Sequence, residues 1–176
     1  YTGMDGSDNE ILGNDVMHNL GHGVWIRTEG GVIAGNTIQA NGGCPDDDLL
    51  SSHDIGCSNQ SDETSAYGIY LGYGAANITI GGDSAEDGNI IQYNRDGGIV
   101  LPYDNNQQIE ITHNVVSRNY GLGMGIDLAD DGFTYNDFED GDIGPNEFQN
   151  YVDYFQVFPL TAQANQFWAW GVTTTG

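Results

Sequence analysis

A short phrase recurs four times along this chain of 176 residues, and it limits the possible fold more than any other feature. It reads Asn, any residue, Ile or Val, two residues and Asn, followed later by Gly, Ile or Val, any residue, and Ile or Leu. The first parts begin at Asn14, Asn36, Asn89 and Asn114, and the second parts begin at Gly23, Gly68, Gly98 and Gly125. One such unit cannot bury its own apolar face, so the repeat predicts a stacked solenoid.

The spacing of the phrase identifies the kind of solenoid. Asn14 and Asn36 are 22 residues apart, and Asn89 and Asn114 are 25 apart. The gap of 53 between Asn36 and Asn89 equals one coil of 22 plus about 31 inserted residues. A period near 22 with alternating apolar residues predicts one coil of a parallel β-helix, whereas the spaced leucines of a leucine-rich repeat are absent. Strand alternation predicts these inward side chains: Ile11, Val16, Val24, Ile26, Ile33, Ile38, Ile69, Leu71, Ile91, Ile99, Leu101, Ile111, Val116, Ile126 and Leu128.

The Asn and Gly columns of the phrase have a structural explanation. Asn tolerates left-handed backbone conformations at turns, and identical Asn side chains stacked at one strand spacing can form a hydrogen-bonded ladder. The Gly that precedes each Gly-Ile-x-Leu strand is expected to make a tight turn. We therefore expect Asn14, Asn36, Asn89 and Asn114 to stack rather than to catalyse.

The phrases resemble the right-handed parallel β-helix repeats of secreted and surface bacterial proteins, which share the architecture of pectate lyases. The resemblance is closest at Gly125-Ile126-Asp127-Leu128, in the acidic loop that follows, and at the segment from Gly144 to Asn150. Surface proteins of this kind often end their repeats with Gly-Pro-Asn-x-x-Gln-Asn-Phe-Pro. This chain departs from that phrase, because residues 151–157 intervene before Phe158-Pro159-Leu160. The resemblance implies an all-β solenoid. It leaves the activity open, since this architecture hosts lyases, hydrolases, epimerases, adhesins and inert stalks.

The chain is predicted to form one domain with two regions. Residues 1–128 are expected to hold about four coils, interrupted by an Asp- and Ser-rich insertion at 42–66. Residues 129–176 combine an acidic loop with an aromatic-rich segment of the same domain. Because an uncovered coil end is an exposed β edge, this last segment is expected to cap the C-terminal coil.

Composition limits the cellular location and the binding partners that can be expected for this chain. Lys is absent, Arg27, Arg95 and Arg118 are the only Arg residues, and the formal net charge is −23. Such a surface repels nucleic acid and anionic membranes. No apolar run is long enough for a membrane span. We expect an extracellular or cell-surface module that forms part of a longer polypeptide.

Both Cys residues lie within the insertion. Cys44 and Cys57 are 13 residues apart, and a disulfide between them would restrict the unfolded loop by about 3 kcal/mol. A disulfide indicates an oxidising compartment outside the cytoplasm. The alternative is two buried free thiols.

The acidic loop is a candidate calcium site. Calcium takes six to eight oxygen ligands, and a Gly-punctuated loop supplies many of them. The expected ligands are Asp130, Asp131, Asp137, Asp140 and Asp142. The loop lacks the EF-hand pattern, and a solvated acidic loop is the alternative. The run at 46–48 is a weaker candidate.

A column of aromatic residues is a candidate carbohydrate-binding face. The outward positions of the Gly-Ile-x-Leu strands, and positions two residues beyond these strands, would place several rings on one surface. The expected contacts are Trp25, Arg27, Tyr70, Tyr73 and Tyr103. Flat rings beside acids suit a polysaccharide or cell-surface glycan, and exposed aromatic patches mark interaction sites. Alternatively, inserted loops cover these rings and make them ordinary core.

An enzyme is the competing interpretation. A glycoside hydrolase of this architecture would use two or three carboxylates, which Asp127, Asp130 and Asp131 could supply. A lyase would need an Arg or Lys base, but Lys is absent and the three Arg share no strand position. His18 and His22 are four residues apart on an expected turn, which does not favour a metal pair. The sequence therefore favours a non-catalytic scaffold, adhesin or glycan-binding module with calcium.

Overall fold

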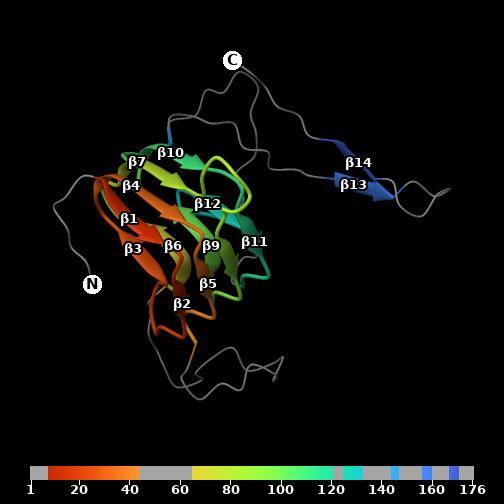
Figure 1. Ribbon diagram of the computed structural model, residues 1–176, viewed down its shortest axis with the longest axis horizontal. Coiled ribbons are helices and arrows are strands. Elements are labelled where there is room, and N and C mark those ends of the chain that lie inside the picture. Colours follow the sequence, from red (N-terminus) through yellow and green to blue (C-terminus); the bar gives the residue numbers. More distant parts are fainter. Residues whose placement is uncertain are drawn as a thin grey trace.

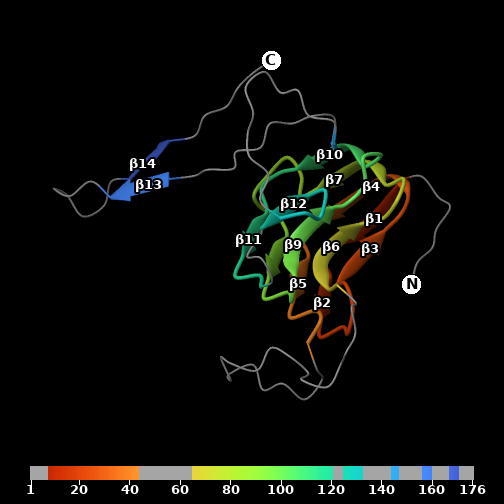
Figure 2. The ribbon, with the colours of Figure 1, turned by 180° about the vertical axis from the view of Figure 1, so that it is seen from behind.

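Three parallel four-stranded sheets make up the body of the computed structural model, which describes residues 8–43, 65–120, 125–132 and 144–146 and the strands at 156–159 and 167–170. Figures 1 and 2 show the sheets wound around one core. The first sheet holds β1 (Asn9–Leu12), β4 (Glu29–Ala34), β7 (Ala76–Ile80) and β10 (Gln107–Ile111). The second sheet holds β2 (Asp15–Met17), β5 (Thr37–Gln39), β8 (Ile90–Gln92) and β11 (Val115–Ser117). The third sheet holds β3 (Val24–Ile26), β6 (Tyr67–Leu71), β9 (Gly97–Leu101) and β12 (Ile126–Leu128).

Each coil contributes one strand to each sheet, so the twelve strands form four coils. Every neighbouring pair within these three sheets is parallel. The predicted parallel β-helix with about four coils is therefore confirmed. Among the residues described, no helix is long and apolar enough to cross a membrane.

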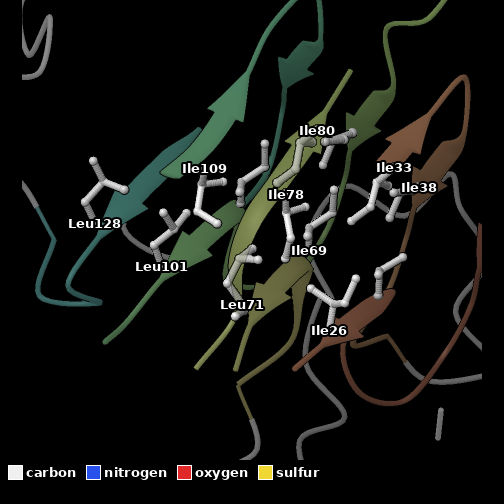
Figure 3. Close-up of a cluster of buried hydrophobic side chains, with 14 residues drawn as sticks. Ile26, Ile33, Ile38, Ile69, Leu71, Ile78, Ile80, Leu101, Ile109 and Leu128 are labelled. Atoms are coloured by element: carbon white, nitrogen blue, oxygen red, sulfur yellow. The ribbon is translucent and has the colours of Figure 1, made fainter. Parts of the chain in front are cut away.

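The core consists of aliphatic side chains stacked from coil to coil (Figure 3). Val24, Ile69, Ile99 and Ile126 occupy one register column, as predicted. The first three are buried, but Ile126 is 40% exposed because it belongs to the last of the four coils. The core also contains Ile78, Ile80 and Ile109 of the first sheet, which the sequence analysis did not identify.

Two Asn ladders run along the corners of the coils, and this prediction is confirmed. In the first ladder, Asn36 Nδ2 donates to Asn89 Oδ1 at 2.9 Å, and Asn89 Nδ2 donates to Asn114 Oδ1 at 2.8 Å. Each of these amides also binds a carbonyl of the preceding coil, as Asn89 Nδ2 does with Ile33 O at 2.7 Å. The second ladder joins Asn19, Asn41, Asn94 and Asn119 in the same way.

The left-handed backbone at the corners does not fall on the ladder Asn, contrary to expectation. It falls on the residue before: His18, Ala40, Tyr93 and Arg118 have φ between 52° and 58°. The physical reason is that the Asn side chain must point toward the neighbouring coil. The preceding residue therefore makes the turn.

The Gly of the phrase is also explained differently than expected in the first three coils, at Gly23, Gly68 and Gly98. Gly68 and Gly98 do not have a positive φ. A Cβ on Gly68 would lie 2.6 Å from Ile91 Cγ2, and one on Gly98 would lie 2.4 Å from Val116 Cγ1. These positions are Gly because core side chains of the second sheet pack directly against the backbone, rather than because of a tight turn.

The C-terminal region contributes two described pieces. Residues 144–146 lie against β10, where Asn146 hydrogen-bonds to Ile109. The strands β13 (Gln156–Pro159) and β14 (Phe167–Trp170) pair antiparallel in a separate two-stranded sheet. This pair does not extend any of the three sheets, so an aromatic cap over the last coil stays a prediction. Cys44 and Cys57 lie outside the described residues, and their disulfide also stays a prediction.

Candidate functional site

A continuous row of aromatic rings lies on the outer face of the third sheet. Trp25 and Tyr70 meet edge to face, with ring centroids 6.2 Å apart. Tyr70 meets Tyr103 at 6.5 Å, and Tyr103 meets Tyr73 at 5.6 Å, both again edge to face. The hydroxyls of Tyr70 and Tyr103 are 3.2 Å apart, within hydrogen-bonding distance. The structure therefore brings together the four rings that the sequence predicted to share a face.

The register of the third sheet explains this arrangement. Strands β3, β6 and β9 lie side by side (Figure 2). Trp25 pairs with Tyr70, and Tyr70 pairs with Val100, so these outward positions stack from coil to coil. Tyr73 and Tyr103 each lie two residues after a strand of this sheet, at the equivalent corner of successive coils. Trp25 is 48% exposed and Tyr73 is 61% exposed, so both rings are accessible.

Arg27 lies beside Trp25 at the N-terminal end of the row. Gly72 explains this closeness, because a Cβ there would lie 2.7 Å from the indole Nε1 of Trp25 and 3.3 Å from Arg27 Cβ. The glycine amide donates to the carbonyl of Ile26 at 2.7 Å. A side chain at position 72 would collide with the Trp25 indole and crowd the Arg27 side chain.

Two members of the face were missed from the sequence. His22 stacks on Tyr70 with centroids 4.4 Å apart, and on Tyr67 with centroids 5.9 Å apart. His22 Nδ1 accepts a hydrogen bond from the backbone N–H of Tyr67 at 3.1 Å. Burial lowers the pKa of His22, against the opposing charges of Asp96 and Asp130, so a neutral imidazole is favoured. Both residues directly precede the Gly of the repeat, and that shared position is the signal that could have found them.

The C-terminal end of the row is acidic. The Tyr67 hydroxyl donates a hydrogen bond to Asp130 Oδ1, and Gly97, its register partner, has no side chain to obstruct the ring. Burial, followed by this hydrogen bond and the charge of Asp130, raises the pKa of Tyr67 well above its usual range. Asp96 Oδ2 accepts a hydrogen bond at 2.6 Å from the amide of Ala66, the residue that precedes Tyr67. Tyr67 is therefore held in its protonated form as a hydrogen-bond donor.

Asp127 occupies the last outward position of the column, and its burial differs from expectation. Strand alternation predicted Val100 and Asp127 to face outside, yet both are buried, and Asp127 is only 5% exposed. Val100 lies between Tyr70 and Asp127 in the register column, so its neighbours on the face cover it.

The Asp127 carboxyl is electrostatically unusual. Its Oδ1 is buried and makes no hydrogen bond. Burial raises its pKa, with a further increase from the charge of Asp130, although the backbone N–H groups of Gly132 and Asp131 oppose the shift. The structure therefore holds a carboxyl whose proton affinity is increased next to the exposed carboxylate of Asp130.

The calcium ligands predicted from the sequence are only partly described. Asp130 and Asp131 are exposed residues after β12, whereas Asp137, Asp140 and Asp142 lie outside the described ranges. Within those ranges, no group of three His, Cys, Asp or Glu side chains is arranged to hold a metal ion. The five-residue calcium site stays a prediction.

Comparison with known proteins agrees with the architecture. A family model described as a right-handed β-helix region matches residues 4–143, which is most of the chain. No curated protein and no solved structure gives a significant match. The match therefore supports the fold of the chain.

Proposed function

Because the chain belongs to the right-handed β-helix family, we propose that it is an extracellular glycan-binding module whose contact surface is the third sheet. The row of rings formed by Trp25, Tyr70, Tyr103 and Tyr73 is the observation that carries this proposal. Its rigid strands would make the module a scaffold or adhesin that presents this face to a polysaccharide or cell-surface glycan.

The chemistry of the face suits a sugar chain. Pyranose rings have an apolar side that packs on aromatic rings, and their hydroxyls bond to nearby acids and amides. The rise of one coil is about 4.8 Å, so one extended chain lying across the third sheet would contact rings from more than one coil.

Affinity electrophoresis tests the proposal, using gels that contain neutral, anionic or cationic polysaccharides. We expect at least one polysaccharide to retard the protein, and we expect Trp25→Ala and Tyr73→Ala each to weaken binding about tenfold or more. Tyr120→Ala is the matched control, because Tyr120 is an exposed ring that takes no part in the row. Equal retardation of all three variants would overturn the proposal.

Calcium and location belong to the same proposal. The net charge of −23 means that the folded surface is strongly self-repelling, and bound cations would relieve this repulsion. Asp130 and Asp131 are exposed at the start of the acidic loop, where a cation could reach them. An extracellular setting supplies both calcium and the oxidising conditions that a bond between Cys44 and Cys57 requires.

Hydrolysis of the bound glycan is the second candidate function. The specific observation in its favour is that Asp127 and the adjacent Asp130 have different environments, one buried with a raised pKa and one exposed. Pairs of carboxyls with divergent proton affinities serve as acid and base in glycosidases. Asp127 would be the general acid, with Asp130 or Asp131 as its partner. Release of reducing ends that is lost in Asp127→Asn would support hydrolysis, and no release from any bound polysaccharide would reject it.

A further inference from the structure

His22 lies among the rings of the aromatic row, on the connection that precedes β3. Its imidazole stacks on Tyr70, with ring centroids 4.4 Å apart and ring planes at 26°, and it meets Trp25 edge to face at 6.3 Å. Its third ring neighbour is Tyr67, with centroids 5.9 Å apart. Three rings therefore hold the imidazole on the face where a sugar chain would lie.

One hydrogen bond determines which nitrogen of His22 carries the proton. Nδ1 accepts from the backbone N–H of Tyr67 at 3.1 Å, so Nδ1 has no proton of its own. In a neutral imidazole the other nitrogen then carries the proton, because the hydrogen bond at one nitrogen sets the tautomer. Burial lowers the pKa of His22 and favours the neutral form, although the charges of Asp96 and Asp130 act in the opposite direction. His22 therefore presents an Nε2–H donor.

This donor is available to a ligand. Within the described residues, His22 makes one hydrogen bond, at Nδ1, and the buried side-chain atoms without a partner are Gln107 Oε1 and Asp127 Oδ1. His22 Nε2 is in neither group, so it is open to solvent. A small number of polar groups in fixed positions among aromatic rings orient a bound ligand and determine its specificity.

We propose that His22 is a specificity-determining residue of the aromatic face and that its Nε2–H donates to an uncharged oxygen of a neutral glycan. Hydroxyl and carbonyl oxygens accept such a bond, whereas an ammonium group only donates. A carboxylate or sulfate could accept it, but the negative charges of Asp96 and Asp130 act on the imidazole and would repel an anion there. This inference rests on the proposed glycan-binding function and specifies its ligand class.

Calorimetric titration at neutral pH, with chelator present to remove bound metal ions, tests the ligand class. The neutral probes are a glucan, a mannan and a xylan oligosaccharide, and the anionic probe is an oligogalacturonate of the same length. We expect at least one neutral probe to bind about tenfold or more tightly than the oligogalacturonate.

Two substitutions separate donation to the glycan from support of the fold. The amide of His22→Gln can place an N–H group where imidazole Nε2 lies, whereas the oxygen of His22→Asn can replace Nδ1 as the acceptor for Tyr67. Both variants lose the ring, so the difference between them isolates the two nitrogens. We expect His22→Asn to weaken binding of the best neutral probe about tenfold and His22→Gln about threefold. Urea unfolding should show the reverse order, with His22→Gln the less stable variant.

His18→Asn is the matched control, because His18 is exposed, lies on the same connection and has a positive φ of 58° that Asn tolerates. It should leave every affinity unchanged. The inference is overturned if His22→Gln binds as weakly as His22→Asn, if His18→Asn loses as much affinity, or if the oligogalacturonate binds more tightly than every neutral probe. Those results leave glycan binding intact. If no probe binds, or if Trp25→Ala leaves every affinity unchanged, the proposed function itself fails.

Discussion

The side-chain amide of Asn146 hydrogen-bonds to the backbone of Ile109 in both directions. Asn146 Nδ2 donates to the Ile109 carbonyl at 2.9 Å, and the Ile109 amide donates to Asn146 Oδ1 at 2.7 Å. One side chain thus satisfies the edge of β10 as a neighbouring strand would. An unsatisfied strand edge is a site for aggregation, so this pair protects the outer edge of β10 at its central residue.

Loss of this pair should destabilise the fold. Asn146→Gly removes both hydrogen bonds while permitting the positive φ of 63° at that position. We expect a loss of about 1–3 kcal/mol in the free energy of unfolding, because the buried Ile109 amide is left without an acceptor. Urea titration measures the change. An unaltered midpoint and slope would show that other contacts or water replace the pair.

The Asn ladders should be most sensitive at their centre. Asn89 is fully buried, accepts a hydrogen bond from Asn36 and donates one to Asn114. Asn14 is exposed and, among the ladder residues, bonds only to Asn36. We expect Asn89→Ala to cost about 3 kcal/mol or more, and Asn14→Ala to cost about 1 kcal/mol. Equal losses of unfolding free energy for the two variants in urea titration would contradict the prediction that a central ladder Asn contributes more than a terminal one.

Asp127 should make the stability depend on pH in a definite direction. Burial and the charge of Asp130 raise its pKa in the folded protein above the usual value of about 3.9. The folded state therefore binds more protons at this site than the unfolded state, and the stabilisation present below pH ~4 is lost as the pH rises through the raised pKa. Relative to the wild type, Asp127→Asn should become progressively more stable over that interval.

Urea unfolding of both proteins at a series of pH values measures this trend. Taking the difference between the two proteins cancels the titration of the other carboxyls. Asp15→Asn is the control for the loss of one negative charge. An identical pH trend in Asp127→Asn and Asp15→Asn would show that the effect comes from net charge rather than from the burial of Asp127.

Calcium should raise the melting temperature if the predicted loop site exists. A ligand that binds only the folded state stabilises it by about 2.7 kcal/mol at one hundred times its Kd. Asp140→Ala and Asp142→Ala should each reduce this effect, and Asp46→Ala should reduce it less. Ionic strength must be fixed, because any salt screens surface repulsion. Equal melting temperatures in calcium and in chelator would leave a solvated acidic loop.

Much of the fold could be predicted because the repeat identifies the residues that stack from coil to coil. The columns of Ile69, Ile99 and the ladder Asn follow from constant offsets in the sequence, and the structure confirms them. The first sheet was harder, because Ile78 and Ile109 lie outside the recurring phrase. Their burial depends on where β7 and β10 fall in the coil, and the phrase does not report that position.

The aromatic face of the third sheet could be predicted only in part. Outward positions gave Trp25 and Tyr70 correctly, but alternation alone cannot predict the burial of Asp127. The burial of Asp127 depends on the groups that pack around β12, the last strand of the third sheet. Tyr67 was missed because its ring crosses the glycine of the next coil to reach Asp130, a contact 63 residues away in the chain. Contacts of this kind depend on three-dimensional stacking rather than on local pattern.

The long segment between β5 and β6 leaves the register of the coils unchanged. Ile38 still stacks on Ile91 before it, and Ile69 still stacks on Ile99 after it. One corner of the coil can therefore vary in length while the core keeps its spacing. During evolution, such a corner can gain or lose residues without redesign of the interior, so its sequence can diverge independently of the core.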